Sequence, residues 1–293
     1  MSYILSCCSM ADMSRAYYES RDIRWIPFHY LIDGVSHLDD QTMPMKDFYN
    51  AMRGGAMTGT AQISTGEFIE YFTPFLEQGL DVLHVCLSTG ISGVYNAACI
   101  ARDDLAARYP DRKLIIVDSL AASSGYGLIM ETLADMRDEG KSIDELTEWI
   151  EAHKLEMRHW FFSTDLTFYI RGGRVSKTSG FFGTVLHICP LLDVDGQGKL
   201  QPREKLRGKK AVIRRIVDKM EATAANGLDY DGKCFISQSD CSEDAKAVAG
   251  LIEERFKKLN GKVRINDIGT GIGSHTGPGT VALFFWGKSR KGE

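Results

Sequence analysis

Short apolar runs recur along the first half of the chain and predict strands. They cover residues 3–7, 23–32, 82–87 and 113–119, and each is short enough to be one buried strand. The run 23–32 contains Pro27, which places it near a sheet edge, because proline cannot donate a ladder hydrogen bond. These runs predict a largely buried sheet.

Amphipathic segments between these runs predict helices. The segment 64–79 opens with Ser64 and Glu67, the spacing of a capping box, and carries phenylalanines at helical intervals. Further helices are predicted at 47–52, 94–105, 123–140 and 142–154. Apolar strands that alternate with helices indicate an α/β domain with a parallel sheet, whose ligands bind beyond the carboxyl ends of the strands.

From about Arg158 the pattern becomes strand-rich. Strands are predicted at 158–164, within 189–207, at 233–240 and in two runs near the end, with helices at 166–177, in the basic segment up to 220, and at 242–259. This mixture favours an α+β domain with a mixed or antiparallel sheet. We therefore predict an α/β protein of two domains, residues 1–157 and 158–293.

Composition narrows the function classes. The 293 residues carry a formal net charge of −4, which gives no basic field for nucleic acid, and no apolar run is long enough to span a membrane. Seven cysteines form no CxxC pair and the histidines no HExxH motif, so we expect reduced thiols, no metal site and no cofactor. Without a basic region before its first apolar residues, the chain is expected to be cytoplasmic.

One turn stands out as a candidate anion site. The strand at 82–87 runs through Ser88, Thr89, Gly90, Ser92 and Gly93 into a helix. Such a turn directs backbone N–H groups and hydroxyls toward one point, where a carboxylate or phosphate can bind. An ordinary capped turn has the same composition, and both interpretations stay open.

Four segments together resemble one known family. They are TAQISTGEF at 60–68, LSTGISGVYNAA at 87–98, IRGGRV at 170–175 and IGSHTGPGTVAL at 272–283, and they occur in the family's order. A fifth stretch, from Cys189 to Ala211, is also similar. On these motifs the chain resembles the DegV family of fatty-acid-binding proteins.

The resemblance implies a fold and a function. It implies two α/β domains, with head-group loops in residues 1–157 and a covered acyl chain in 158–293. It implies no chemistry by this chain alone: the protein would bind a long-chain fatty acid and present it to a fatty acid kinase subunit, with room for transient contact with a membrane. The chain departs from the family pattern at Cys8, Ala61, Ile63 and Cys189, which bears on the choice of ligand.

The resemblance also implies site residues. Thr60 and Ser92 match the positions that hold the carboxylate, although Thr60 could instead cap a turn and Ser92 its own helix. His275, in a glycine-rich segment, is expected to contact the head group or assist phosphoryl transfer. Ser9, Ser88 and Ser119, each at a strand end, are secondary candidates.

Three arginines are assigned to the partner or to phosphoryl transfer. Arg171 and Arg174 flank Gly172-Gly173, and Arg203 matches a family arginine that serves the kinase. We expect Arg174, Arg203 and His275 to lie outside the acyl pocket. Arginines on a solvated surface or helix end would look the same in sequence. Candidates for an acyl tunnel, each equally compatible with the core, are Phe168, Phe181, Phe182, Leu186, Ile188 and Phe284.

Two other functional classes are alternatives to a fatty-acid-binding protein. A stand-alone hydrolase could use Cys8 or Ser92 as nucleophile with His275 as base, but there is no Gly-x-Ser-x-Gly elbow and no evident carboxylate to orient the histidine. A nucleotide-binding protein would need a P-loop or a Rossmann glycine motif, and neither occurs.

Overall fold

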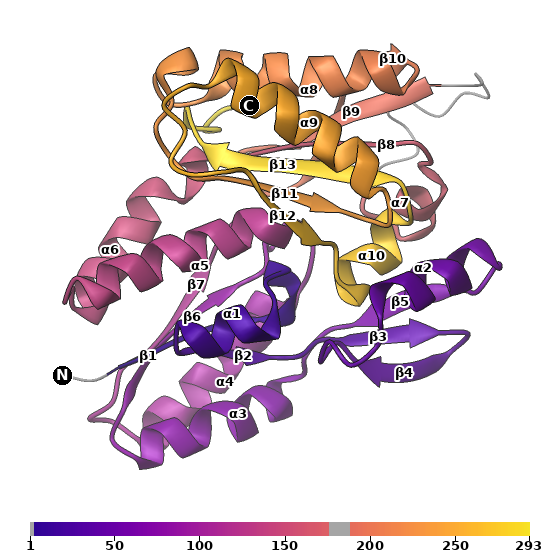
Figure 1. Cartoon of the computed structure of the whole chain (residues 1–293). Helices are drawn as coiled ribbons and strands as arrows, with labels where there is room; N and C mark the ends of the chain where they lie inside the picture. The colour runs from indigo at the N-terminus through magenta and orange to yellow at the C-terminus, as the bar shows by residue number, and fades with distance from the viewer. Residues whose placement is uncertain (1–2, 176–187) are drawn as a thin grey trace.

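A four-stranded parallel sheet forms the centre of the first domain in the computed structural model, which describes residues 3–175 and 188–293 (Figure 1). Its strands, in sheet order, are β2 (Ile23–Ile26), β1 (Tyr3–Cys8), β6 (Asp81–Cys86) and β7 (Leu114–Asp118). Helices cover both faces: α3 (Thr65–Glu77) and α4 (Val94–Arg108) on one side, α5 (Ser123–Asp138) and α6 (Ile143–His153) on the other. Short helical segments are η1 (Ser9–Ala11), α1 (Arg15–Ser20) and η2 (Lys154–Glu156).

The predicted capping box at α3 is present. Ser64 accepts a hydrogen bond from the Glu67 backbone N–H, and the Glu67 carboxylate accepts one from the Ser64 N–H in return. Ser142 and Glu145 make the same pair at α6. Both helices therefore begin where local side-chain chemistry satisfies their free N–H groups.

The apolar run 23–32 is two strands, not one. It divides at Pro27: β2 joins the parallel sheet, and β3 (His29–Ile32) joins a separate antiparallel sheet of three strands. That sheet has β3 between β4 (Val35–Leu38) and β5 (Thr58–Ala61), with α2 (Met45–Arg53) against it. Proline lacks the N–H that a continuous strand would need, so it marks the change of sheet.

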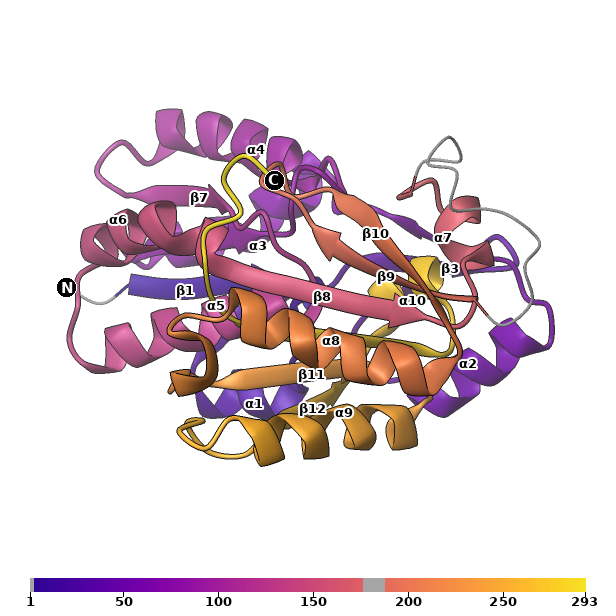
Figure 2. The same cartoon turned by 90° about the horizontal axis from the view of Figure 1, so that it is seen from above.

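The second domain is built on a six-stranded mixed sheet, seen from above in Figure 2. Its strands, in sheet order, are β10 (Leu200–Arg207), β9 (Ile188–Val194), β8 (Met157–Ser163), β13 (Thr280–Trp286), β11 (Cys234–Gln238) and β12 (Arg264–Asp267). All neighbours are antiparallel except β11 and β12. The outer face is covered by α8 (Lys209–Thr223) and α9 (Ser242–Arg255), and the inner face rests on α5. Short helices are α7 (Thr167–Arg171), η4 (Gly227–Asp229) and α10 (Thr270–Thr276).

The predicted fold class is confirmed, with a parallel sheet in the first half and a mixed one in the second. The boundary at residues 157 and 158 stays a prediction, and β8 begins at Met157. Across the described residues, no helix has both the length and the apolar character that crossing a bilayer requires.

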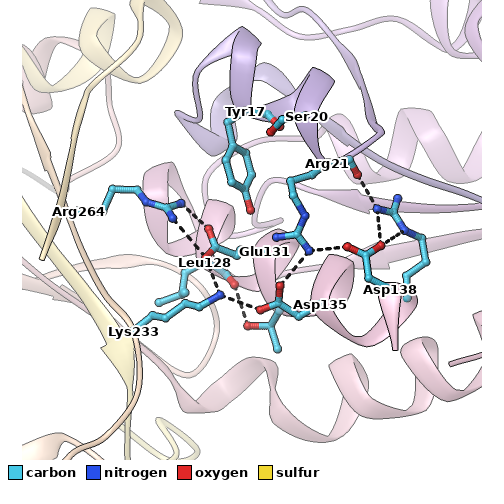
Figure 3. A network of polar contacts seen from close by, with 11 residues as sticks. Tyr17, Ser20, Arg21, Leu128, Glu131, Asp135, Asp138, Lys233 and Arg264 are labelled. Carbon is cyan, nitrogen blue, oxygen red and sulfur yellow. Dashed lines mark hydrogen bonds and ion pairs between the residues drawn. The ribbon is translucent and has the colours of Figure 1, made fainter. Parts of the chain in front are cut away.

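An ionic network joins the two domains (Figure 3). Glu131 on α5, only 2% exposed, is paired with Arg264 of β12, and its Oε1 lies 2.6 Å from the Lys233 ammonium. Lys233 also reaches Asp135 at 2.7 Å, and Arg21 binds the same carboxylate at 2.9 Å. A carboxylate this deeply buried needs its cations, so the network favours one arrangement of the domains.

Candidate functional site

A cavity lies between the two domains. The first domain contributes the turn before α4 and the start of α5; the second contributes the inner face of the mixed sheet together with α7 and α10. Among the described residues that line it, none is acidic and most are apolar, including Ile91, Phe161, Val194, Leu200, Ile272 and Phe284.

The cavity follows the strands of the mixed sheet. Antiparallel pairing sets Thr280 beside Ser163, Ala282 beside Phe161 and Phe284 beside His159. At least one residue of each pair lines the cavity, which therefore spans three successive rows of side chains. The four residue steps from Thr280 to Phe284 cover about 14 Å, so the cavity extends along the strands over this length.

Thr60 and His275 meet at the polar end. Thr60 Oγ1 lies 2.8 Å from His275 Nε2, and His275 lines the cavity. Burial, with a smaller effect from Arg174, lowers the pKa of His275 to about 4, so the imidazole is neutral at pH 7. Its Nδ1 is buried and has no hydrogen-bond partner among the described residues. A buried polar atom without a partner is rare, and Gly172 packs against this one.

Gly172 and Gly173 shape the loop that covers this histidine. A Cβ on Gly172 would lie 2.5 Å from His275 Nδ1, so only glycine allows the loop to approach this closely. Gly173 has φ +69°, a conformation that glycine adopts without strain. The chain then turns back, and Arg174 Nη1 donates to the Gly172 carbonyl at 2.5 Å.

Arg174 lies on the cavity wall, as His275 does, which corrects the expectation that these two residues lie outside the acyl pocket. Burial lowers the pKa of its guanidinium, and no carboxylate in the described chain is paired with it. A half-buried arginine whose bond within the described part of the chain goes to a carbonyl retains donors for an anion.

Ser92 lies close to this end of the cavity. Its Oγ accepts a hydrogen bond from Val94 N–H at 3.3 Å, although the N-cap of α4 is Gly93, and its neighbour Ile91 lines the cavity. The Gln62 side chain lies against Gly93, where a Cβ would be 2.8 Å from Gln62 Oε1. The segments that carry Thr60 and Ser92 are therefore adjacent.

Ser9, Ser88 and Ser119 do not line this cavity. Ser88 Oγ donates to the Gly198 carbonyl at 2.8 Å and so fastens the β9–β10 turn to the first domain. Ser119 accepts from Ala121 N–H within its own turn, and Ser9 accepts from Phe28 N–H. All three make bonds that hold the backbone.

Arg171 and Arg203 lie outside the cavity and are exposed. Arg171 stacks on Phe168, with its guanidinium carbon 5.4 Å from the ring centroid. Arg203 lies where the pairing of β10 with β9 shifts register, and its Nε is 2.8 Å from the carboxylate of Asp193. A bulge of this kind redirects a side chain outward.

Of the residues predicted to line an acyl tunnel, some line the cavity and others do not. Phe284 lines the cavity, whereas Phe168 packs on Gly277 and Ile188 begins β9 away from it. Phe181, Phe182 and Leu186 lie outside the described residues. Sequence reasoning missed Tyr169 and Thr280, whose hydroxyls are 3.1 Å apart on the cavity wall, because nothing local distinguishes them from core residues.

The geometry of the described residues does not favour nucleophilic catalysis by Cys8 or Ser92. Cys8 is fully buried, and burial raises the pKa of its thiol to about 11. Among the described contacts, no hydrogen bond joins Cys8 or Ser92 to His275, and the imidazole meets Thr60 rather than a carboxylate. Nor does the described part of the chain hold a group of three or more metal-ligating side chains.

Comparison with known proteins identifies the family. Residues 8–288 match the family model described as "Uncharacterised protein, DegV family". A DegV domain-containing protein of Clostridium perfringens is 35% identical over 291 residues, which is 99% of each chain. The chain belongs to the DegV family.

Solved structures share the fold. A DegV lipid-binding protein of Thermotoga maritima matches with a TM-score of 0.86 and 25% identity, covering 99% of this chain and all of that one. The fatty acid kinase B3 protein of Streptococcus pneumoniae, solved with linoleic acid, matches with a TM-score of 0.85 and 20% identity, covering 98% of this chain and all of that one.

Proposed function

We propose that this protein binds a long-chain fatty acid in the cavity between its domains. The observation that carries the proposal is a largely apolar cavity whose wall includes Arg174 and His275, with Thr60 bonded to that histidine. A fatty acid has the same division, with a long apolar chain and a single anionic head. The solved relatives include a lipid-binding protein and a protein loaded with linoleic acid, which supports the proposal.

The cavity can accommodate both parts of a fatty acid, the acyl chain and the carboxylate. Removing an acyl chain from water contributes about 0.8 kcal/mol for each CH₂ group, so a dry apolar cavity can bind one tightly. A buried carboxylate needs donors or a cation. Arg174 supplies a cation, and the Ser92 hydroxyl together with the one donor left to the Thr60–His275 pair supply hydrogen bonds.

We further propose that the protein presents the fatty acid to a kinase subunit and has no activity alone. One solved relative is itself named as a fatty acid kinase protein. Arg203 and Arg171 are exposed and lie away from the cavity, where a partner can reach them. Because a kinase draws on ATP, this role places the chain in the cytoplasm.

Native mass spectrometry of the purified protein tests the binding proposal. We expect added mass in the fatty-acid range that organic extraction removes and that a labelled long-chain fatty acid restores. Failure of the delipidated, folded protein to take up any such acid would contradict it. Hydrolysis of an ester by the purified chain, abolished in His275→Ala, would instead support the hydrolase alternative.

A further inference from the structure

Two buried carboxyl groups of the first domain hold the beginning of α10, the helix that carries His275. Asp12 Oδ1 accepts a hydrogen bond from Gly269 N–H at 3.0 Å, and Asp39 Oδ1 accepts one from Thr270 Oγ1 at 2.5 Å. Asp12 is 7% exposed and Asp39 4%. Both aspartates come from loops far away in sequence, so these bonds cross the domain interface.

The place of α10 depends on such contacts. It has seven residues, two of them glycine, and so short a helix is not stable by itself. Gly271 lies against Met10, and Gly273 lies against Tyr49, so the helix is fitted closely to the first domain. At its other end, Thr58 Oγ1 donates to the Ser274 carbonyl.

Asp12 also contacts the cavity wall. The Ser123 hydroxyl, on a residue that lines the cavity, lies 2.5 Å from Asp12 Oδ2. Both residues have left-handed backbone, with φ +49° at Asp12 and +54° at Ser123. Two strained residues bonded to each other indicate that the arrangement is held by the structure around it. Asp12 thus links the start of α5 to the start of α10.

These carboxyl groups act through hydrogen bonds rather than ion pairs. Across the described residues, no lysine, arginine or histidine is paired with either of them, and the charged neighbours of Asp12 are Asp39 and Asp267. Burial raises the pKa of Asp12 to about 8, so this carboxyl is largely protonated at pH 7.

We propose that Asp12 and Asp39 are positioning residues that fix α10 and thereby set the place of the His275 imidazole at the head-group end. His275 lies five residues along the helix from Thr270, about 8 Å by helical rise. A small movement at the start of α10 is therefore carried to the imidazole. This inference rests on the proposed fatty acid function.

Affinities for a fatty acid and for the alcohol of the same chain length test it. Asp12→Gly removes the carboxyl but tolerates the left-handed backbone, and Asp39→Ala removes the second carboxyl. We expect each variant to lower affinity for the acid about tenfold, the effect of one lost hydrogen bond or more. Affinity for the alcohol should change little, because the alcohol has no anionic head.

Two further variants sharpen the test. Asp12→Asn can still accept from Gly269 N–H and can donate to Ser123 Oγ, so it should retain the wild-type ratio of acid to alcohol affinity. If Asp12→Gly does not fold, Thr270→Val, which removes only the hydroxyl bound to Asp39, should still lower that ratio. Asp240→Asn is the matched control, since Asp240 also has left-handed backbone and joins the domains through Arg53.

The outcomes are distinct. An equal loss of acid and alcohol affinity, or an unchanged ratio in Asp12→Gly and Asp39→Ala, would overturn the positioning role. Asp12→Asn behaving like Asp12→Gly would also overturn it. If wild-type protein binds neither ligand, the proposed function itself fails.

Discussion

The Thr60 hydroxyl and the His275 imidazole lie 2.8 Å apart although 215 positions separate them in the chain. Thr60 is on β5 of the first domain and His275 on α10 of the second, so this bond forms only when the domains are assembled. Two residues chosen from separate motifs thus become one unit at the end of the cavity.

Thr60→Val and Ser92→Ala should each weaken binding of a fatty acid. Loss of one hydrogen bond to a charged group costs roughly 1.5–3 kcal/mol, and loss of the Thr60 bond also frees the imidazole. The double variant should fall short of the summed effects, because both hydroxyls serve one anion. Isothermal titration with the delipidated protein measures this. Unchanged affinity in Ser92→Ala would show that Ser92 does not contact the ligand and serves only the beginning of its helix.

Gly172→Ala should weaken binding without unfolding the protein. Its backbone is ordinary for alanine, but the new Cβ would lie 2.5 Å from His275 Nδ1 and displace the ring. Gly250→Ala in α9 is a matched control, because a Cβ there meets nothing within 4 Å and a helix gains about 1 kcal/mol from the exchange. Wild-type affinity in Gly172→Ala would show that the ring position is unimportant.

Titration of His275 should contribute a fall in the free energy of unfolding between pH 6.5 and 4, while Asp12, whose pKa is raised, contributes a rise in the same window. The folded-state pKa of His275 is lowered to about 4, so in this window the unfolded chain takes up the proton first. A shift of this size contributes on the order of 3 kcal/mol. His275→Gln should reduce the slope, as measured by urea unfolding at several pH values. The slope will not vanish, because burial also lowers the pKa of His84, to about 3.

Arg203→Gln should retain the fatty acid but lose acyl-phosphate formation with a cognate kinase. Its side chain lies outside the cavity and pairs with Asp193 at the β10 bulge. Bound lipid and kinase turnover are measured on the same sample. Arg174→Gln provides the contrast: because Arg174 lines the cavity, this variant should lose fatty acid affinity as well. Normal kinase turnover with Arg203→Gln would show that Arg203 has only a structural role.

Glu131→Ala should destabilise the protein by roughly 1.5–3 kcal/mol, since it removes the bonds that Lys233 and Arg264 make to a buried carboxylate. Glu19→Ala is the control: its pair with Arg15 is exposed on both sides and contributes at most about 1 kcal/mol. Chemical unfolding compares the two. Equal, small effects would show that the network in Figure 3 does not hold the domains together.

Local chemistry made much of the fold predictable. Continuous apolar runs gave β6 and β7, because strands buried on both faces need apolar side chains throughout, and Ser64 with Glu67 marked the beginning of α3. The resemblance of four short motifs to the DegV family was enough to select Thr60, His275 and Arg174 as candidate site residues.

The sequence by itself therefore determined which segments become strands and helices and which residues are candidates for the site. Only the tertiary structure decided that Pro27 separates two sheets, that glycine-rich 270–276 is a helix, and that Arg174 lies on the cavity wall. Asp12 and Gly269 are bonded across 257 positions, a pairing that no local pattern records. The physical reason is that propensity and capping act over a few residues, whereas burial and hydrogen bonding between domains depend on the whole packed chain.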